Sequence, residues 1–296
     1  MFNFLQTPIT VVAFDAGAAN HIISWVKEFG HESIRVCVKG PALTLWEQAF
    51  PHENNNEDLN MVLADAGTLI SGTGWASSLE HDARKVAQQL GIKSIAVIDH
   101  WTNYGARFVR DEVEVLPDEV WVTDEYAKKL SEIEFPCIKI VQKPNLYLDG
   151  LVKDVRFYER SVGNSAGGNL LYVLEPIRES WGSDVINGEF LGLNFFINKI
   201  ETFGLKKDVV VRLRPHPSDP VFKYDGWINS HKSMNITLDR LPTLAESIAW
   251  SDVVVGCQTY AMVLALAAGK RVFSSIPTWA PQCVLPQSGI VRLSSL

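Results

Sequence analysis

The sequence predicts an α/β protein made of two Rossmann-like domains, each with a parallel sheet, that face each other across a cleft. Short apolar runs alternate with amphipathic helical stretches in both halves of the 296-residue chain. Strands that alternate with helices form parallel sheets through right-handed crossovers. Between the halves, residues 151–169 carry charged side chains and then a run rich in Ser, Gly and Asn, which is typical of a linker.

The first half contains six apolar runs that predict strands and two patterns that predict helices. The strands are expected at residues 9–14, 33–38, 68–70, 93–98, 120–123 and 138–141, and the helices at 21–29 and 77–90. We expect residues 1–155 to form the N-terminal domain.

The second half repeats this alternation without repeating the sequence. Strands are expected at residues 170–174, 209–213, 235–238, 252–255 and 271–273, and helices at 190–203, 244–250 and 260–268. We expect residues 156–296 to form the C-terminal domain. Since ligands bind at the carboxyl ends of parallel strands, polar residues that follow a strand are the candidates for function.

The composition is that of a globular enzyme without a nucleic-acid or membrane-spanning role. Hydrophobic residues make up 47% and charged residues 21%, and the net charge of −7 supplies no general basic field. The four cysteines form no C-x-x-C pair, and no His/Cys/Asp cluster has metal-ligand spacing. We expect a cytoplasmic protein without metal or cofactor, and leave peripheral association with the inner membrane or a synthase complex open.

Asp15 opens a loop of small residues that runs to Asn20, between the first strand and the first helix. Small residues let a ligand approach the backbone closely, and Asn20 adds an amide for a sugar hydroxyl. Asp15 could act as a general base that takes a proton from a hydroxyl nucleophile. Capping of the following helix explains the same residue equally well.

Two further loops in the first half carry residues suited to a sugar. The loop after residue 70 contains Thr73 and Trp75, although helix capping explains its hydroxyls almost as well. The loop after residue 98 gathers polar and aromatic groups, which suit sugar hydroxyls and sugar faces. Its candidate residues are Asp99, His100, Trp101 and Asn103. Asp99 and His100 are also alternative candidates for the acid or base.

Two loops in the second half carry residues suited to a phosphate. Arg214, His216 and Pro217 follow an apolar run, and arginine and histidine can donate hydrogen bonds to an anion. Gln258 and Thr259 precede a predicted helix, whose first backbone N–H groups attract an anion. A solvated basic turn and simple helix capping are the alternative interpretations.

The run from Asp208 to Pro277 resembles the C-terminal domain of GT-B-fold glycosyltransferases. Within that group, the Arg-Pro-His-Pro segment around His216 is most similar to the His-Pro motif of bacterial transferases that use CMP-activated acidic sugars, the sialyl-, polysialyl- and Kdo transferases. The resemblance implies that His216 contacts the CMP phosphate and stabilises the leaving group. It also implies a phosphate-loop role for Thr259 and a general-base role for Asp15.

The sequence departs from the family pattern in two places. Gln258 stands where the family's second phosphate-loop hydroxyl is expected. Leu264 stands where enzymes that use UDP- or GDP-sugars carry a ribose-binding glutamate, which favours a CMP-sugar donor.

We therefore expect a metal-independent, inverting glycosyltransferase of bacterial surface polysaccharide synthesis. It would transfer a nonulosonic acid (sialic, legionaminic or pseudaminic acid) or Kdo from a CMP donor in the C-terminal domain to a glycan acceptor in the N-terminal domain. The alternatives are a UDP-GlcNAc 2-epimerase-like enzyme or nucleotide-sugar hydrolase, and a CDP-polyol phosphotransferase. A non-catalytic sugar- or nucleotide-binding subunit is the alternative of another class.

Overall fold

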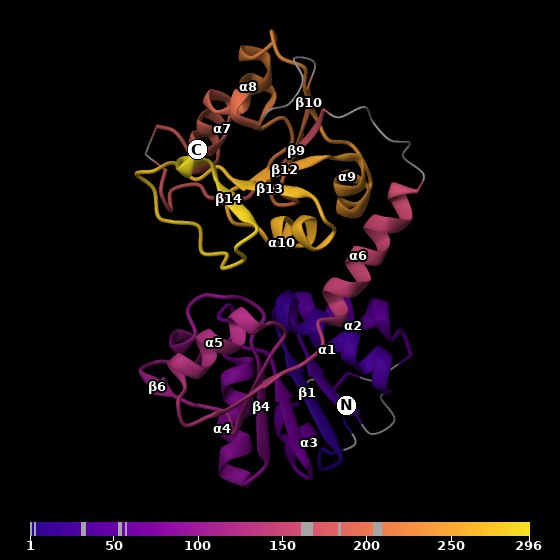
Figure 1. The fold of residues 1–296 in the computed structure, drawn as a ribbon. Helices are drawn as coiled ribbons and strands as arrows, with labels where there is room; N and C mark the ends of the chain where they lie inside the picture. The colour runs from indigo at the N-terminus through magenta and orange to yellow at the C-terminus, as the bar shows by residue number, and fades with distance from the viewer. Residues whose placement is uncertain are drawn as a thin grey trace. The chain divides into compact units, whose positions relative to one another are not determined.

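The computed structural model describes residues 2, 4–30, 34–52, 55–56, 58–160, 168–182, 185–203 and 209–296, with the backbone alone for residues 202 and 203. The chain divides into two compact units, unit 1 (Met1–Tyr147) and unit 2 (Leu148–Leu296) (Figure 1). Each unit contains a six-stranded sheet in which every described strand pair is parallel.

Unit 1 has the sheet order β2-β1-β3-β4-β7-β8. Its first elements are β1 (Ile9–Ala13), α1 (Ala16–Phe29), β2 (Ile34–Val38), α2 (Gly40–Ala49), α3 (Leu59–Leu63), β3 (Thr68–Ser71), α4 (Leu79–Leu90) and β4 (Lys93–Val97). The 3₁₀ helix η1 (Gly105–Phe108), the hairpin of β5 (Val109–Arg110) and β6 (Val113–Glu114), β7 (Glu119–Val122), α5 (Glu125–Glu134) and β8 (Lys139–Gln142) follow.

Strand β1 shows why the sheet of unit 1 is covered by helices on both faces. All five of its residues are buried, and successive side chains of a strand point to opposite faces. Val11 and Ala13 pack in a cluster with Trp25 of α1, whereas Val12 packs in a second cluster with Ala83 of α4. A strand that is buried on both faces reads as a continuous apolar run.

Unit 2 has the sheet order β11-β10-β9-β12-β13-β14. Helix α6 (Leu146–Glu159) leads into β9 (Asn169–Val173), α7 (Gly188–Asn198), the 3₁₀ helix η2 (Ile200–Phe203), β10 (Val210–Arg214), α8 (Asp225–Ser230) and β11 (Ile236–Leu238). These are followed by α9 (Leu244–Trp250), β12 (Val253–Gly256), α10 (Tyr260–Ala267), β13 (Arg271–Ser274), β14 (Ile290–Arg292) and the 3₁₀ helix η3 (Leu293–Ser295).

Each sheet has one point at which the chain order of the strands reverses. In unit 1 this point lies between β1 and β3, and in unit 2 it lies between β9 and β12. The loops that leave two such strands diverge to opposite faces of the sheet and open a crevice between them. The loops after β1 and β3 carry Asp15 and Trp75, and the loops after β9 and β12 carry Glu175 and Gln258.

The linker expected at residues 151–169 is wrong over its first part, because α6 continues to Glu159. Val152 and Val155 are buried on one side of this helix, at the spacing of one helical turn. The charged residues that resemble a linker, such as Lys153 and Asp154, are its exposed face. The Gly- and Ser-rich residues 161–167 lie outside the described residues, and the boundary expected after residue 155 falls inside α6.

The first helix begins earlier than the sequence indicates. We expected it from residue 21, but α1 starts at Ala16, so the small residues that follow Asp15 form its first turn. Asp15 occupies the N-cap position, yet its side chain makes no capping hydrogen bond. The carboxylate is therefore directed elsewhere.

Candidate functional site

A cavity of about 260 Å³ lies at the strand reversal of unit 1. Four residues that the sequence singles out line it, namely Asp15, Trp75, Asp99 and His100. The other lining residues are Ala18, Gly74, Thr102 and Arg107. Loops that are distant in sequence meet here because β1, β3 and β4 are neighbours in the sheet and end at the same edge.

The Asp15 carboxylate is pressed against the backbone of Gly74. A Cβ atom on Gly74 would lie 1.8 Å from Oδ2 of Asp15, so only glycine fits at that position. Burial raises the pKa of the Asp15 carboxyl group, and the nearby charge of Asp99 raises it further. A hydrogen bond from the backbone N–H of Trp75 and the charges of Arg107 and Arg110 act in the opposite direction without cancelling the rise. Asp15 is thus a carboxylate of increased basicity.

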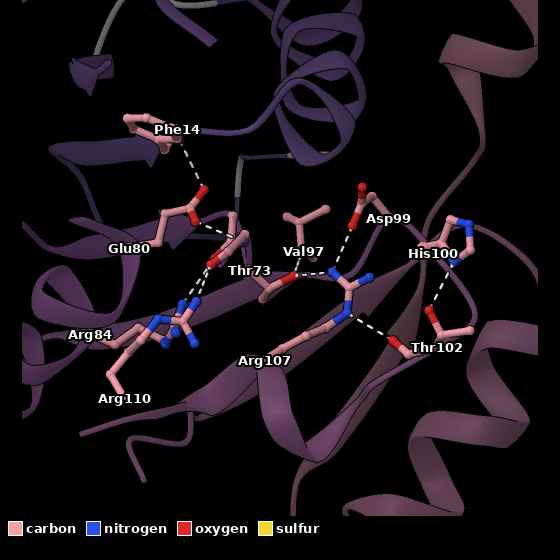
Figure 2. Close-up of polar contacts among 12 residues, drawn as sticks. Phe14, Thr73, Glu80, Arg84, Val97, Asp99, His100, Thr102, Arg107 and Arg110 are labelled. Carbon is pink, nitrogen blue, oxygen red and sulfur yellow. Dashed lines mark hydrogen bonds and ion pairs between the residues drawn. The ribbon is translucent and has the colours of Figure 1, made fainter. Parts of the chain in front are cut away.

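Arg107 connects the loop after β3 with the loop after β4 (Figure 2). Its Nη1 donates to Asp99 Oδ1 at 2.9 Å and to Thr73 Oγ1 at 3.1 Å, and its Nε donates to the carbonyl oxygen of Thr102 at 3.1 Å. The guanidinium carbon lies 5.4 Å from the centre of the Trp75 ring, within the range of a cation–π contact. Arg107 was not predicted as a site residue, because no strand directly precedes it in the sequence.

Thr73 is fully buried and holds Arg107 in place through a hydrogen bond. Its hydroxyl donates to the carbonyl oxygen of Val97 at 3.0 Å and accepts from Arg107. Asp99 is fixed on its other side by Gly17, where an added Cβ would lie 1.6 Å from Asp99 Oδ2. One carboxylate oxygen of Asp99 thus faces Arg107, and the other packs on the first turn of α1.

The remaining predicted residues of unit 1 have different surroundings. His100 lines the cavity, with Nδ1 at 3.2 Å from Thr102 Oγ1, and burial lowers the pKa of its imidazole, with Arg107 acting in the same direction against Asp99. Trp101 is buried and donates from Nε1 to Asp124 Oδ2 at 2.9 Å. Asn103 adopts a left-handed φ of 60° next to η1. The residues that line the cavity do not include Trp101, Asn103 or Asn20.

Glu80 and Arg84 of α4 lie directly behind this site, and neither was a candidate site residue from the sequence. Both are only 1% exposed. Glu80 accepts the backbone N–H of Phe14 at 3.0 Å and that of Gly74 at 2.7 Å, and Arg84 donates to the carbonyl oxygen of Gly72 at 2.9 Å. Burial raises the pKa of Glu80 to about 6 and lowers that of Arg84 to about 10. The sequence signal that could have revealed their burial is their helical spacing from Ala83 and Ala87, which are buried on the same helix.

In unit 2, Arg214 lies at the end of β10 in a buried polar cluster. Its Nη1 donates to Asp239 Oδ2 at 2.5 Å, to Ser247 Oγ at 2.7 Å and to the carbonyl oxygen of Leu241 at 3.1 Å. The Asp239 side chain is completely buried, whereas that of Arg214 is 22% exposed. This arrangement ties β10 to the segment after β11 and to α9.

His216 and Pro217 follow β10 in an exposed turn. The imidazole Nδ1 of His216 lies 2.8 Å from Ser218 Oγ, and the backbone N–H of His216 donates to Asp219 Oδ2 at 3.1 Å. Asp219 is in turn held by Lys223 and by the hydroxyl of Tyr224. The turn is thus fixed by its own side chains, and the His216 ring lies at the surface.

Gln258 and Thr259 precede α10, as expected. Thr259 is the N-cap residue, and its Oγ1 accepts the N–H of Ala261 at 3.4 Å. The N–H of Gln258 donates to Glu175 Oε2 at 3.0 Å. Glu175 follows β9, which lies between β10 and β12, so the sheet order places it between the loops of His216 and Gln258. Burial raises the pKa of Glu175 to about 7.

Glu175 escaped sequence reasoning because it is a single acid after a predicted strand, without a motif around it. Among the described residues, no group of three or more His, Cys, Asp or Glu side chains could hold a metal ion. No helix in the described part of the chain combines the length and apolar character needed to cross a bilayer.

Comparisons with known proteins show the fold. No protein-family model matches the sequence, and no curated protein sequence matches it. A crystal structure assigned as a UDP-N-acetylglucosamine 2-epimerase from Listeria monocytogenes matches with a TM-score of 0.60 and 14% identity, over 91% of this chain and 79% of that one. A variant of the wall teichoic acid polymerase TagF matches with a TM-score of 0.51 and 10% identity, over 91% and 70% of the two chains. The predicted pair of Rossmann-like parallel-sheet domains is confirmed.

Proposed function

We propose that this chain is an inverting glycosyltransferase of the GT-B type, in which Asp15 is the general base. One observation carries the proposal. At the strand reversal of unit 1, where α/β sheets bind their ligands, Asp15 lines a cavity and burial raises its pKa. A carboxylate that is not used as a cap and has increased basicity is suited to accept a proton from a hydroxyl group.

The cavity has the chemistry of a site for one sugar unit of an acceptor. Its volume of about 260 Å³ lies just below the ~300–1,000 Å³ of sites for drug-sized ligands. Trp75 is half exposed and offers an aromatic face for a sugar ring. His100, Thr102 and Asp99 supply hydrogen-bond donors and acceptors for its hydroxyls. In this proposal the N-terminal half binds the acceptor.

The C-terminal half would bind the donor, for which we propose a CMP-activated acidic sugar, a nonulosonic acid or Kdo. The support is the His-Pro segment, the exposed ring of His216, and the N-terminus of α10 behind Thr259. His216 and the N–H groups near Thr259 would stabilise the charge that develops on the phosphate of the departing CMP. Arg214 would hold the end of β10 in place for His216.

The reaction is then a single displacement. The acceptor hydroxyl oxygen attacks the anomeric carbon of the donor, Asp15 takes the hydroxyl proton, and the bond between the anomeric carbon and the phosphate oxygen breaks with CMP as the leaving group. No step assigned to a residue here involves a metal. We propose that the product belongs to a bacterial surface polysaccharide and that the chain acts on the cytoplasmic side of the membrane.

The first test is calorimetric titration of CMP, CDP, UDP and GDP into the purified chain, followed by transfer assays with CMP-nonulosonic acids and CMP-Kdo. We expect selective binding of CMP, weakened by His216→Ala and unchanged in the surface control His52→Ala. We expect Asp15→Asn to retain CMP binding but to lose about 10²–10⁴-fold in transfer rate, the usual contribution of a general base.

Other outcomes select other functions. Selective UDP binding, with sugar-nucleotide turnover that needs no acceptor, would contradict the proposal and indicate an epimerase-like enzyme or a hydrolase. Selective CDP binding would indicate a polyol-phosphate transferase. Binding without turnover, unaffected by Asp15→Asn, would indicate a non-catalytic subunit.

A further inference from the structure

The buried carboxylate of Glu80 connects the two loops that hold the Asp15 carboxylate in place. Its Oε1 accepts the N–H of Phe14, the residue before Asp15, and its Oε2 accepts the N–H of Gly74, on whose Cα the Asp15 carboxylate rests. Phe14 follows β1 and Gly74 follows β3, at the strand reversal of the sheet. Figure 2 shows the contact between Glu80 and the backbone of Phe14. Glu80 therefore links the loops after β1 and β3 beyond the point where the backbone hydrogen bonds between these two strands end.

The side chain of Glu80 is itself held with little freedom. Gly72 leaves no room beside it, since an added Cβ would lie 2.1 Å from Glu80 Oε1. One turn further along α4, Arg84 donates to Gly72 O and to Ser71 Oγ at 2.9 and 3.1 Å. The Arg84 guanidinium thus fixes the loop after β3. The N–H of Gly74 in the same loop donates to the Glu80 carboxylate.

We propose that Glu80 is a positioning residue for Asp15, and that the ionised Glu80 orients the Asp15 carboxylate toward the cavity. This rests on the proposed function only for the catalytic consequence. Two acceptor oxygens for two N–H donors are available only in the carboxylate form, because a protonated oxygen would face a donor. A glutamine would create the same donor–donor conflict at one of the two N–H groups.

The ionised state of Glu80 depends on its surroundings. The charged groups that face Glu80 are Arg84, which favours its ionised form, and Asp15, which disfavours it. Burial is the largest influence and raises the pKa of Glu80 to about 6. The positioning of Asp15 by the carboxylate therefore operates above that pH and fades below it.

Amide and carboxyl NMR titration of the full chain tests the positioning without any activity. We expect the amide resonances of Phe14 and Gly74 to titrate together near pH 6 in the wild-type chain. In Glu80→Gln this titration should disappear, and the carboxyl resonance of Asp15, identified by its loss in Asp15→Asn, should change its chemical shift because the carboxylate is displaced. The control Asp82→Asn, on the exposed side of α4, should change none of these signals.

Kinetics then test the catalytic consequence. We expect Glu80→Gln to lower kcat for transfer by about 10²-fold, as displacement of a catalytic group by an ångström does, with CMP affinity unchanged. Glu80→Asp keeps the charge but shortens the reach of the side chain, so it should still lower kcat.

An unchanged carboxyl resonance of Asp15 in Glu80→Gln, or Phe14 and Gly74 amides that do not titrate near pH 6 in the wild-type chain, would overturn the proposal. The second of these needs no variant, so it holds even if Glu80→Gln fails to fold. A wild-type chain without transferase activity would instead refute the proposed function, while the NMR titrations would still decide the role of Glu80.

Discussion

Gly74 is the residue at which the Asp15 site is most sensitive to an added atom. In Gly74→Ala the new Cβ would meet Asp15 Oδ2 at 1.8 Å, so the carboxylate must leave its position. We expect a transfer rate at least about 10²-fold lower, since the base is displaced, with a loss of stability of no more than ~1–3 kcal/mol from local overpacking. Steady-state kinetics and denaturant unfolding measure the two effects separately.

The matched control is Gly150→Ala. Gly150 lies in α6, has no atom within 4 Å of an added Cβ, and has an ordinary helical backbone. Replacing a helical glycine by alanine should raise the free energy of unfolding by about 0.5–1 kcal/mol and leave transfer unchanged. Equal kinetics for Gly74→Ala and Gly150→Ala would contradict the assignment of Asp15.

Glu175 should make the stability of unit 2 depend on pH. Burial raises its folded-state pKa from 4.5 to about 7. The protonated form is thus favoured by folding, and this stabilisation is complete below pH 4.5 and is lost as the pH rises through 7. Each unit of pKa shift corresponds to about 1.36 kcal/mol in the free energy of unfolding. We therefore expect Glu175→Gln to abolish a pH-dependent loss of stability of up to about 3 kcal/mol.

Urea denaturation at pH 4.5, 6 and 8 checks this, with Glu179→Gln as the exposed control four residues away. Glu175→Gln should be more stable than the wild-type chain at pH 8 and similar to it at pH 4.5. Parallel curves for the two chains would show that Glu175 is not perturbed in the folded state.

At the scale of elements, the cluster around Arg214 joins β10, the segment after β11, and α9. Removing the guanidinium by Arg214→Ala leaves the buried carboxylate of Asp239 without its cation, which costs about 3–5 kcal/mol. Denaturant unfolding should show that loss, and the double substitution with Asp239→Ala should cost less than the sum of the single ones. Reduced CMP affinity without a loss of stability would instead make Arg214 a direct nucleotide contact.

The elements that the sequence predicts well are those with continuous apolar runs. Each expected strand is present within one or two residues, because most of these strands carry a run of apolar residues, and in β1, β3, β7 and β12 every residue is buried. α9 has the expected bounds of 244 to 250. The helices that escaped prediction bury few side chains. α2 buries only Ala42 and Trp46, and α5 buries only Ala127 and Ser131. With so few fully buried positions, these helices show little periodicity to detect.

At the scale of the whole molecule, the two units should unfold in separate steps. The buried clusters of unit 1 and those of unit 2 draw on different segments of the chain. We expect CMP at 100 times its dissociation constant to stabilise only the unit 2 transition, by about 2.7 kcal/mol.

Core truncations assign the two calorimetric transitions. Val97→Ala, in a buried cluster of unit 1, should lower one transition, and Leu213→Ala, in a buried cluster of unit 2, should lower the other. The transition that moves with Leu213→Ala should be the one that CMP raises. A single transition that responds to both substitutions would show that the units unfold together.

The candidate site could be predicted only as far as its residues follow strands. Asp15, Trp75, Asp99 and His100 were found in this way, because the carboxyl ends of parallel strands collect ligands. Their assembly around one cavity depends on the strand order β1-β3-β4, which no local pattern encodes. Glu80 was missed because its burial results from the packing of α4 on that edge, and a charged helix residue is ordinarily solvated.

Three acids at the candidate site of unit 1 each rest against a glycine: Asp99 on Gly17, Glu80 on Gly72, and Asp15 on Gly74. In each pair the acid occupies the volume that the glycine's missing side chain leaves free. Neither member can change alone without a collision or a void. Among related chains the two positions of each pair should therefore vary jointly. This co-variation would identify the site even in relatives whose sequences have otherwise diverged.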